Sequence, residues 1–139
     1  MKPIMVFTDG ACKGNPGMMG VGIVIIPDSD NPQKKLTFCK NLGQGTNNIA
    51  ELKAVELALE EVEKLNDPRP VIIYSDSQYT VNVLKRFKIT KNEELINDIK
   101  AKMLLYEPGV EITYIPGHQK NIHNELADRL ASNAAIYLR

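Results

Sequence analysis

Apolar runs alternate with polar, glycine-containing and proline-containing stretches along the chain of 139 residues. Three short apolar runs come first, and their β-branched residues predict strands at residues 4–7, 21–26 and 34–42. The stretch 12–20, CKGNPGMMG, is dense in glycine and proline and predicts a turn or loop. Because the three strands follow one another with short connections, the pattern predicts an antiparallel meander.

The rest of the chain has the pattern of helices placed between further strands. In residues 47–65 apolar side chains recur every three or four positions, which predicts a helix that Asn47 or Asn48 caps and NDPRP ends. The other predicted elements are strands at 71–75 and 110–115 and helices at 77–87, 92–106 and 122–137. The order βββαβααβα predicts an α/β fold with a mixed sheet, in which the last two strands run parallel after right-handed crossovers.

The length suits one compact domain, so we expect residues 1–139 to form a single domain. The 43% hydrophobic and 24% charged residues are ordinary for a globular protein. No apolar run approaches the roughly 20 residues that span a bilayer, and the N-terminus lacks a signal-peptide core. We therefore expect a cytoplasmic protein without a membrane partner. Two cysteines make no disulfide framework, so we expect free thiols, with Cys39 in the core of its strand.

The formal net charge is zero, which argues weakly against a protein that binds nucleic acid through bulk electrostatics. The charges are nevertheless unevenly distributed. Residues 51–67 carry six acids and two bases, whereas residues 85–91 carry four bases and no acid. Such runs form either a solvated face or a binding surface, and the run alone does not separate the two.

Four carboxylates occupy positions where a charge is unexpected. Asp9 and Asp76 follow predicted strands, and parallel strands would bring both to the carboxyl edge where open α/β sheets bind ligands. Glu51 lies on the apolar face of its predicted helix, and Asp128 lies on a helix side with two alanines. Burial of such a group is unfavourable unless something compensates its charge.

Each carboxylate also has a plain structural explanation. An aspartate before glycine, as at Asp9, is a common turn pair, and Asp76 is a possible helix cap. Glu51 lies near the positive end of its helix dipole, and Asp128 has an adjacent arginine. One common cause is simpler than four separate ones. Clustered carboxylates about 4 Å apart repel by roughly 4 kcal/mol per pair at an effective dielectric near 20, so bound divalent cations would explain them.

An oxygen-only ligand set favours the hard ions Mg²⁺ or Mn²⁺. Two such ions close together are the apparatus of in-line phosphoryl chemistry, in which one activates water and the other stabilises the leaving oxygen. Four sequence blocks then resemble, in order and spacing, the motifs of type 1 ribonuclease H: FTDGACKGNPG, GTNNIAELKAVELAL, IIYSDSQY and GHQKNIHNELADRLA. They extend from Phe7 to Ala131 and so sample nearly the whole chain.

The resemblance implies a ribonuclease H-like fold, with a five-stranded mixed sheet in the order 3-2-1-4-5 and flanking helices. It implies endonucleolytic hydrolysis of the RNA strand of an RNA/DNA hybrid by two Mg²⁺ ions, for which Mn²⁺ can substitute, leaving 5′-phosphate and 3′-hydroxyl ends. The implied metal ligands are Asp9, Glu51, Asp76 and Asp128. His118 matches the family histidine that assists proton transfer or product release, whereas His123 has no such match and is expected at the surface.

The resemblance also implies a set of residues that contact the hybrid: Cys12, Asn15, Thr46, Asn47, Asn48 and Gln78. A protein that reads RNA needs hydrogen-bonding groups for the 2′-hydroxyls, and amide side chains both donate and accept. Thr46 matches a residue of the pocket that holds a DNA phosphate. Helix capping is the plain alternative for Asn47 and Asn48.

The chain departs from many relatives, which carry a longer, tryptophan-containing basic segment that grips the DNA strand. Here LKRFKITKNEE is all that remains, with Lys85, Arg86, Lys88 and Lys91 as a reduced version and Phe87 as an apolar surface. We expect a monomer without a preceding hybrid-binding domain, and binding that is weaker and more dependent on metal and salt than in basic relatives. The competing hypotheses are a catalytically silent hybrid-binding module, a small nucleotide-binding or regulatory domain, and a domain of a larger polymerase.

Overall fold

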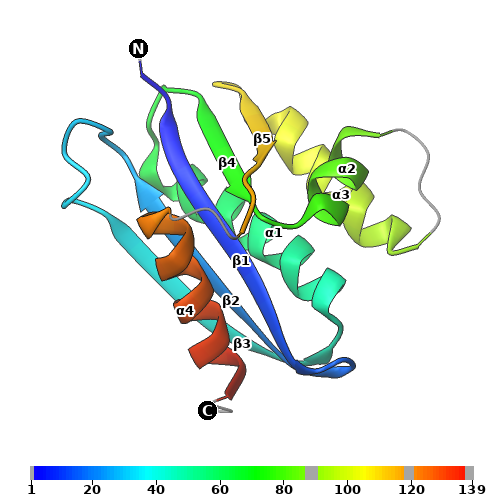
Figure 1. The fold of residues 1–139 in the computed structure, drawn as a ribbon. Helices are drawn as coiled ribbons and strands as arrows, with labels where there is room; N and C mark the ends of the chain where they lie inside the picture. The colour runs from blue at the N-terminus through cyan, green and yellow to red at the C-terminus, as the bar shows by residue number, and fades with distance from the viewer. Residues whose placement is uncertain (1, 87–90, 118–120, 137–139) are drawn as a thin grey trace.

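The computed structural model describes residues 2–86, 91–117 and 121–136. Its centre is a five-stranded sheet in the order β3-β2-β1-β4-β5, which confirms the predicted topology (Figure 1). The strands are β1 (Ile4–Gly14), β2 (Gly17–Ile26), β3 (Leu36–Gly45), β4 (Val71–Ser75) and β5 (Val110–Tyr114). β1 to β3 pair antiparallel, and β4 lies between β1 and β5 and is parallel to both.

The helices in the described part of the chain are α1 (Asn47–Leu65), α2 (Gln78–Lys85), α3 (Glu93–Leu105) and α4 (Ile122–Ile136). α1 packs on one face of the sheet together with α2 and α3, whereas α4 covers the other face across β1 to β3 (Figure 1). Because side chains alternate along a strand, Ile4 and Val6 enter the larger core under α1, and Phe7 enters the smaller core under α4. None of these helices has the length and apolarity that a membrane-spanning helix requires.

The turn predicted in residues 12–20 is present at residues 15 and 16, but the rest of this stretch is not a loop. β1 and β2 continue through this stretch as a hairpin, which turns only between Gly14 and Gly17. Gly20 in this stretch reflects helix packing rather than a loop: a Cβ on it would lie 2.3 Å from the carbonyl oxygen of Ala131 in α4. Strand glycines of this kind mark the close approach of another backbone.

Cys39 is exposed, so its predicted place in the core is also wrong. It lies on β3, an edge strand of the sheet whose residues are mostly exposed or half-buried. The alternation of apolar and polar residues in this strand is only partial, and the sequence alone does not show which part of the strand α4 leaves uncovered.

Candidate active site

Two of the four predicted carboxylates meet where β1 and β4 separate. The parallel pairing of these strands ends at Thr8 and Ser75. Asp9 directly follows Thr8, and Asp76 directly follows Ser75. Asp9 is not at the end of its strand as predicted, because β1 continues beside β2 and pairs Asp9 with Gly22. Both carboxylates nevertheless leave the sheet at the carboxyl end of β4, as expected for a ligand-binding edge.

Asp76 does not cap the helix that follows it. The cap of α2 is Ser77, whose hydroxyl oxygen accepts a hydrogen bond of 3.1 Å from the backbone N–H of Thr80. The backbone N–H of Ser77 in turn donates to the hydroxyl of Ser75. Since neighbouring serines perform these local roles, the capping explanation for Asp76 is wrong and its carboxylate is left for the cluster.

Glu51 reaches the sheet edge because α1 packs directly on the backbone of β1. A Cβ on Gly10 would lie 2.4 Å from the backbone nitrogen of Glu51, so only glycine permits this approach. The backbone N–H of Gly10 donates a hydrogen bond of 2.7 Å to Oε1 of Glu51. This bond orients the glutamate toward Asp9, the residue that precedes the glycine.

Asp9, Glu51 and Asp76 form a three-carboxylate cluster, in which one oxygen atom of each lies within 4.8 Å of the other two. Asp9 is only 4% exposed. The donors are all hard oxygens, which suits Mg²⁺ or Mn²⁺ and not a soft metal. The residues present therefore fit a site for divalent cations.

The raised pKa values of the three carboxyl groups indicate a site that a bound positive charge would stabilise. Burial, followed by the charge of Glu51, raises the pKa of Asp9 to about 11. Burial and the charge of Asp76 raise the pKa of Glu51 to about 8, although the Gly10 N–H partly opposes this shift. Burial also raises the pKa of Asp76. Without a cation the cluster retains a proton near neutral pH, so cation binding must compete with protons.

Asp128 lies beside the three-carboxylate cluster but is exposed. Its carboxyl group adds to the raised pKa of Asp9 through a hydrogen bond and to that of Glu51 through its charge. The expectation that Asp128 occupies the alanine side of its helix is wrong, because Ala127 and not Asp128 faces the sheet together with Ala131. The outward position leaves Asp128 at the rim, accessible to a ligand.

Asn124 belongs to the residue spacing that matches the family motif, but the sequence reasoning assigned it no role at the site. It lies one turn before Asp128 on α4, is 2% exposed, and its Oδ1 has no hydrogen-bond partner among the described residues. A hydrogen bond from its side chain partly opposes the raised pKa of Asp76. The i,i+4 spacing from Asp128 was the available signal, since it places both residues on one side of the helix.

The structure tests the prediction for His123 but not the prediction for His118. His118 lies outside the described residues, so its predicted role stays a prediction. Its neighbour Gly117 is described, and a Cβ there would lie 2.9 Å from Oδ2 of Asp76, so Gly117 itself lies against the cluster. His123 is not the surface residue expected: its ring lies 5.2 Å from that of Phe7, and burial lowers its pKa.

The predicted substrate residues lie in the β1–β2 hairpin and at the starts of α1 and α2. The thiol of Cys12 donates to the carbonyl oxygen of Gly45, and Oδ1 of Asn15 accepts from the backbone N–H of Asn47. These contacts join the β1–β2 hairpin to the start of α1. The N-cap of α1 is Thr46, so the predicted capping by Asn47 or Asn48 is wrong. Both asparagines are exposed, as is Gln78 at the start of α2.

Comparison with known proteins identifies the family. A sequence model described as RNase H matches residues 1–136. The chain belongs to the ribonuclease H family. It is 36% identical to a ribonuclease H of Trichodesmium erythraeum, over 95% of this chain and 88% of the relative. It is 33% identical to ribonuclease HI of Haemophilus ducreyi, over 97% of this chain and 92% of that protein.

Solved structures of the ribonuclease H family share the fold. LC11-RNase H1 in complex with an RNA/DNA hybrid superposes with a TM-score of 0.80 at 28% identity, covering 96% of both chains. RNase H1 of the archaeon Halobacterium salinarum NRC-1 superposes with a TM-score of 0.77 at 27% identity, covering 96% of this chain and 97% of the other.

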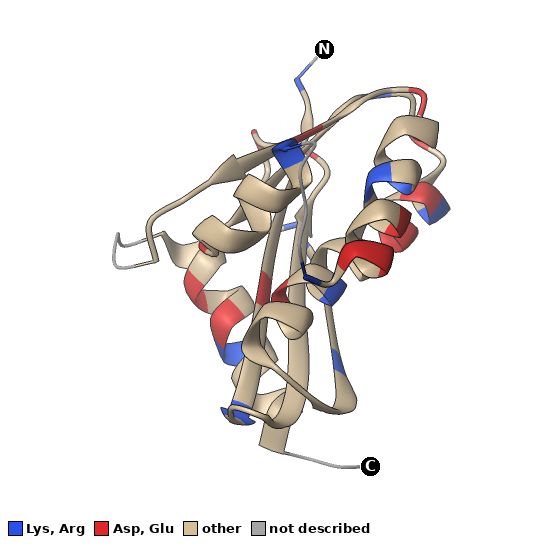
Figure 2. Ribbon diagram, turned by 90° about the vertical axis from the view of Figure 1, so that its right-hand side faces the viewer, with Lys and Arg blue, Asp and Glu red and all other residues tan. Residues whose placement is uncertain are grey.

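The basic run of residues 85–91 begins at the end of α2. Lys85 and Arg86 are exposed, whereas Phe87 and Lys88 lie outside the described residues. Many more charged residues lie on the helices than on the strands (Figure 2). A short basic stretch thus begins at the end of α2. Its role in binding the DNA strand stays a prediction.

Proposed function

We propose that the protein is an endonuclease that hydrolyses the RNA strand of an RNA/DNA hybrid and leaves 5′-phosphate and 3′-hydroxyl ends. The observation that carries the proposal is the convergence of Asp9, Glu51 and Asp76 at the carboxyl end of β4, in a chain of the ribonuclease H family. The hybrid bound in the LC11-RNase H1 structure supports the substrate class.

Asp9, Glu51, Asp76 and Asp128 would hold two Mg²⁺ ions, and Mn²⁺ would substitute. When bound, such ions supply Lewis-acid activation of the attacking water and stabilisation of the leaving oxygen. The protein helps to set the ligands: the Gly10 N–H donates a hydrogen bond to Glu51, and the Asn124 side chain partly opposes the raised pKa of Asp76. Asp9, Glu51 and Asp128 lie within β1, α1 and α4, and Asp76 directly follows β4.

His118 is the proposed group for proton transfer or product release. Recognition of the hybrid is assigned to Cys12, Asn15, Thr46, Asn47, Asn48 and Gln78. The exposed amides suit the 2′-hydroxyls of the RNA strand, and the hairpin–α1 contacts hold several of them at one edge. With a net charge of zero, fewer phosphate contacts than in a basic protein are expected, and affinity then depends on the polar contacts and the cations.

We further propose that residues 1–139 act as one catalytic domain and as a monomer. The match of the family model over residues 1–136 supports the single domain. The proposed compartment is the cytoplasm, since a hybrid substrate arises where DNA is copied and transcribed. Sedimentation of the purified chain at two concentrations tests the monomer.

The decisive experiment is cleavage of an 18-base-pair hybrid with labelled RNA, in Mg²⁺, Mn²⁺ or EDTA. Duplex RNA and duplex DNA serve as substrate controls. We expect metal-dependent cutting of the hybrid RNA alone, its loss in Asp76→Asn, and its retention in Asp98→Asn, which changes an exposed carboxylate on α3. Binding of the hybrid without cutting in either metal would contradict the proposal and favour a binding module.

A further inference from the structure

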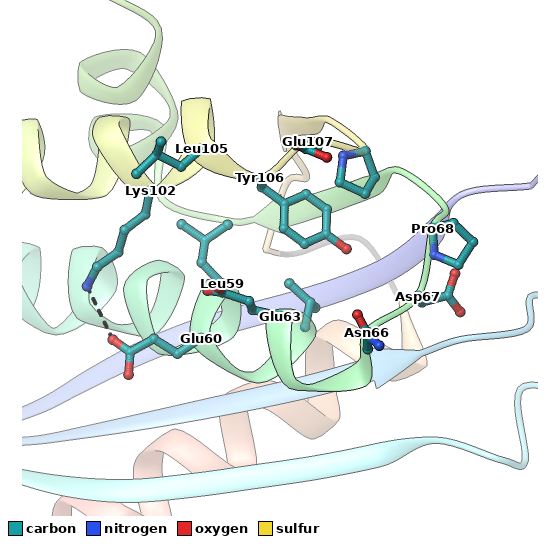
Figure 3. Close-up of a pocket in the computed structure, with 12 residues that line it drawn as sticks. Leu59, Glu60, Glu63, Asn66, Asp67, Pro68, Lys102, Leu105, Tyr106 and Glu107 are labelled. Atoms are coloured by element: carbon teal, nitrogen blue, oxygen red, sulfur yellow. Dashed lines mark hydrogen bonds and ion pairs between the residues drawn. The ribbon is translucent and has the colours of Figure 1, made fainter.

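A cavity of about 460 Å³ lies at the opposite end of the parallel strands from the carboxylate cluster. Its walls come from the end of α1, the end of α3 and the loops that lead into β4 and β5 (Figure 3). Pro68 and Pro108 of those loops precede β4 and β5, whereas Asp76 follows β4. A five-residue strand separates the two ends by roughly 16 Å, so an occupant of this cavity leaves the catalytic edge free.

The charge around this cavity is negative. Four acids and one base line it, and the base, Lys102, already pairs with Glu56 and Glu60. Glu63 and Glu107 form no ion pair with any described residue. The C-caps of α1 and α3 both line the cavity, so two negative helix ends point toward it. The surroundings therefore favour a cation and repel phosphate groups.

The same cavity also has an apolar side. Leu59 and Val62 form part of its wall, and Leu105 is 79% exposed at its edge. The adjacent Leu104 is 87% exposed. Tyr106 lies in the wall, and its hydroxyl is buried without a partner among the described residues (Figure 3). A small inorganic cation or a polyamine leaves these apolar groups uncovered, whereas a peptide side chain covers them.

We propose that this cavity docks a short basic segment of a partner protein, with one aliphatic side chain in the cavity and flanking Lys or Arg residues against Glu63 and Glu107. Nucleic acid is excluded as the occupant because its phosphates would meet the carboxylates. The site is independent of hybrid cleavage, since it contains none of the residues assigned to that reaction. It would tether the nuclease to a partner while the catalytic edge stays open.

The test uses the fluorescein-labelled peptide GKRLKKG and the full chain at low salt, with fluorescence anisotropy as the readout. We expect saturable binding that weakens about tenfold when Glu63→Lys and Glu107→Lys are combined, since each exposed pair contributes up to about 1 kcal/mol. Leu105→Ser and the peptide GKRSKKG should each weaken binding severalfold. Asp98→Lys, on α3 but outside this cavity, should bind as the unaltered protein does, and every variant should cleave hybrid normally.

Several outcomes would overturn the proposal. These are no saturable binding, equal binding of the peptide GEDLEEG, and equal binding after the double charge reversal. If neither Leu105→Ser nor the peptide GKRSKKG weakens binding, the contact is only diffuse electrostatic attraction, and the docking site is also rejected. Sedimentation that shows a dimer dissociated by Leu105→Ser would assign the surface to a second copy of the chain instead.

Discussion

Replacing Asp9 by asparagine should stabilise the folded protein in the absence of a divalent cation. The substitution keeps the shape of the side chain and replaces a buried carboxyl group, one of three within 4.8 Å, that must take up a proton on folding by an amide that is neutral at every pH. At that separation and an effective dielectric of about 20, each pairwise repulsion amounts to about 3.5 kcal/mol. The proton that the cluster retains removes part of this repulsion. We therefore expect Asp9→Asn to raise the free energy of unfolding by about 2 kcal/mol at pH 7.5.

The pH dependence gives this prediction a distinctive signature. The pKa of Asp9 is raised to about 11 in the folded state, above its value of about 3.9 in an unfolded chain. The favourable contribution of the protonated group is therefore complete below about pH 4 and is lost as the pH rises toward the folded value. Asp9→Asn should match the unaltered protein at pH 4 and exceed it increasingly up to pH 8.

Thermal and urea unfolding in EDTA measure the effect, and about 2 kcal/mol corresponds to a rise in Tm of roughly 8 °C for a chain of this size. Asp98→Asn is the matched control, because it removes an exposed charge of the same sign and should change Tm little. Saturating Mg²⁺ should stabilise the unaltered protein and the control more than Asp9→Asn. Equal or lower stability of Asp9→Asn at pH 7.5, with no dependence on pH, would refute the electrostatic account of the cluster.

Three other changes test the surrounding structure. Gly22→Ala places a Cβ 2.2 Å from a carbonyl oxygen of α4, so urea unfolding should show a loss of about 3 kcal/mol; a change below about 0.5 kcal/mol would contradict the packing. Asn124→Ala removes a hydrogen bond that opposes the raised pKa of Asp76, so calorimetry should find that Mg²⁺ binding requires a higher pH, and an unshifted pH profile would reject this positioning role. Gln78→Ala, at an exposed position, should raise KM for the hybrid severalfold with little change in kcat, whereas a fall in kcat alone would contradict a role in substrate contact.

The order of the elements and the sheet topology could be predicted from the sequence because both depend on local patterns. The helical spacing in α1 and the apolar runs of β1, β2 and β4 indicate the element types directly. Short connections then restrict the first three strands to a meander, and crossover handedness restricts the last two. The candidate carboxylates were visible for the same reason, since Asp9 and Asp76 directly follow predicted strands and Glu51 interrupts an apolar face.

Contacts between distant backbones explain where the prediction failed. The glycines of the β1–β2 hairpin predict a loop when only local propensity is considered, but Gly20 permits the close approach of α4, which is far away in the sequence. The exposure of Cys39 depends on which part of β3 other elements leave open. Asn124 shows no local signal of burial, because it is buried only once the start of α4 packs beside Asp76.

The sequence by itself determined which residues carry the chemistry: their types, their order and their places at strand ends and on helix faces. Only the tertiary structure decided which of them converge. The parallel pairing of β1 with β4 aligned Asp9 with Asp76, and the glycine contact between β1 and α1 brought in Glu51. The physical reason is that local spacing sets direction along an element, whereas distances between elements depend on packing of whole surfaces.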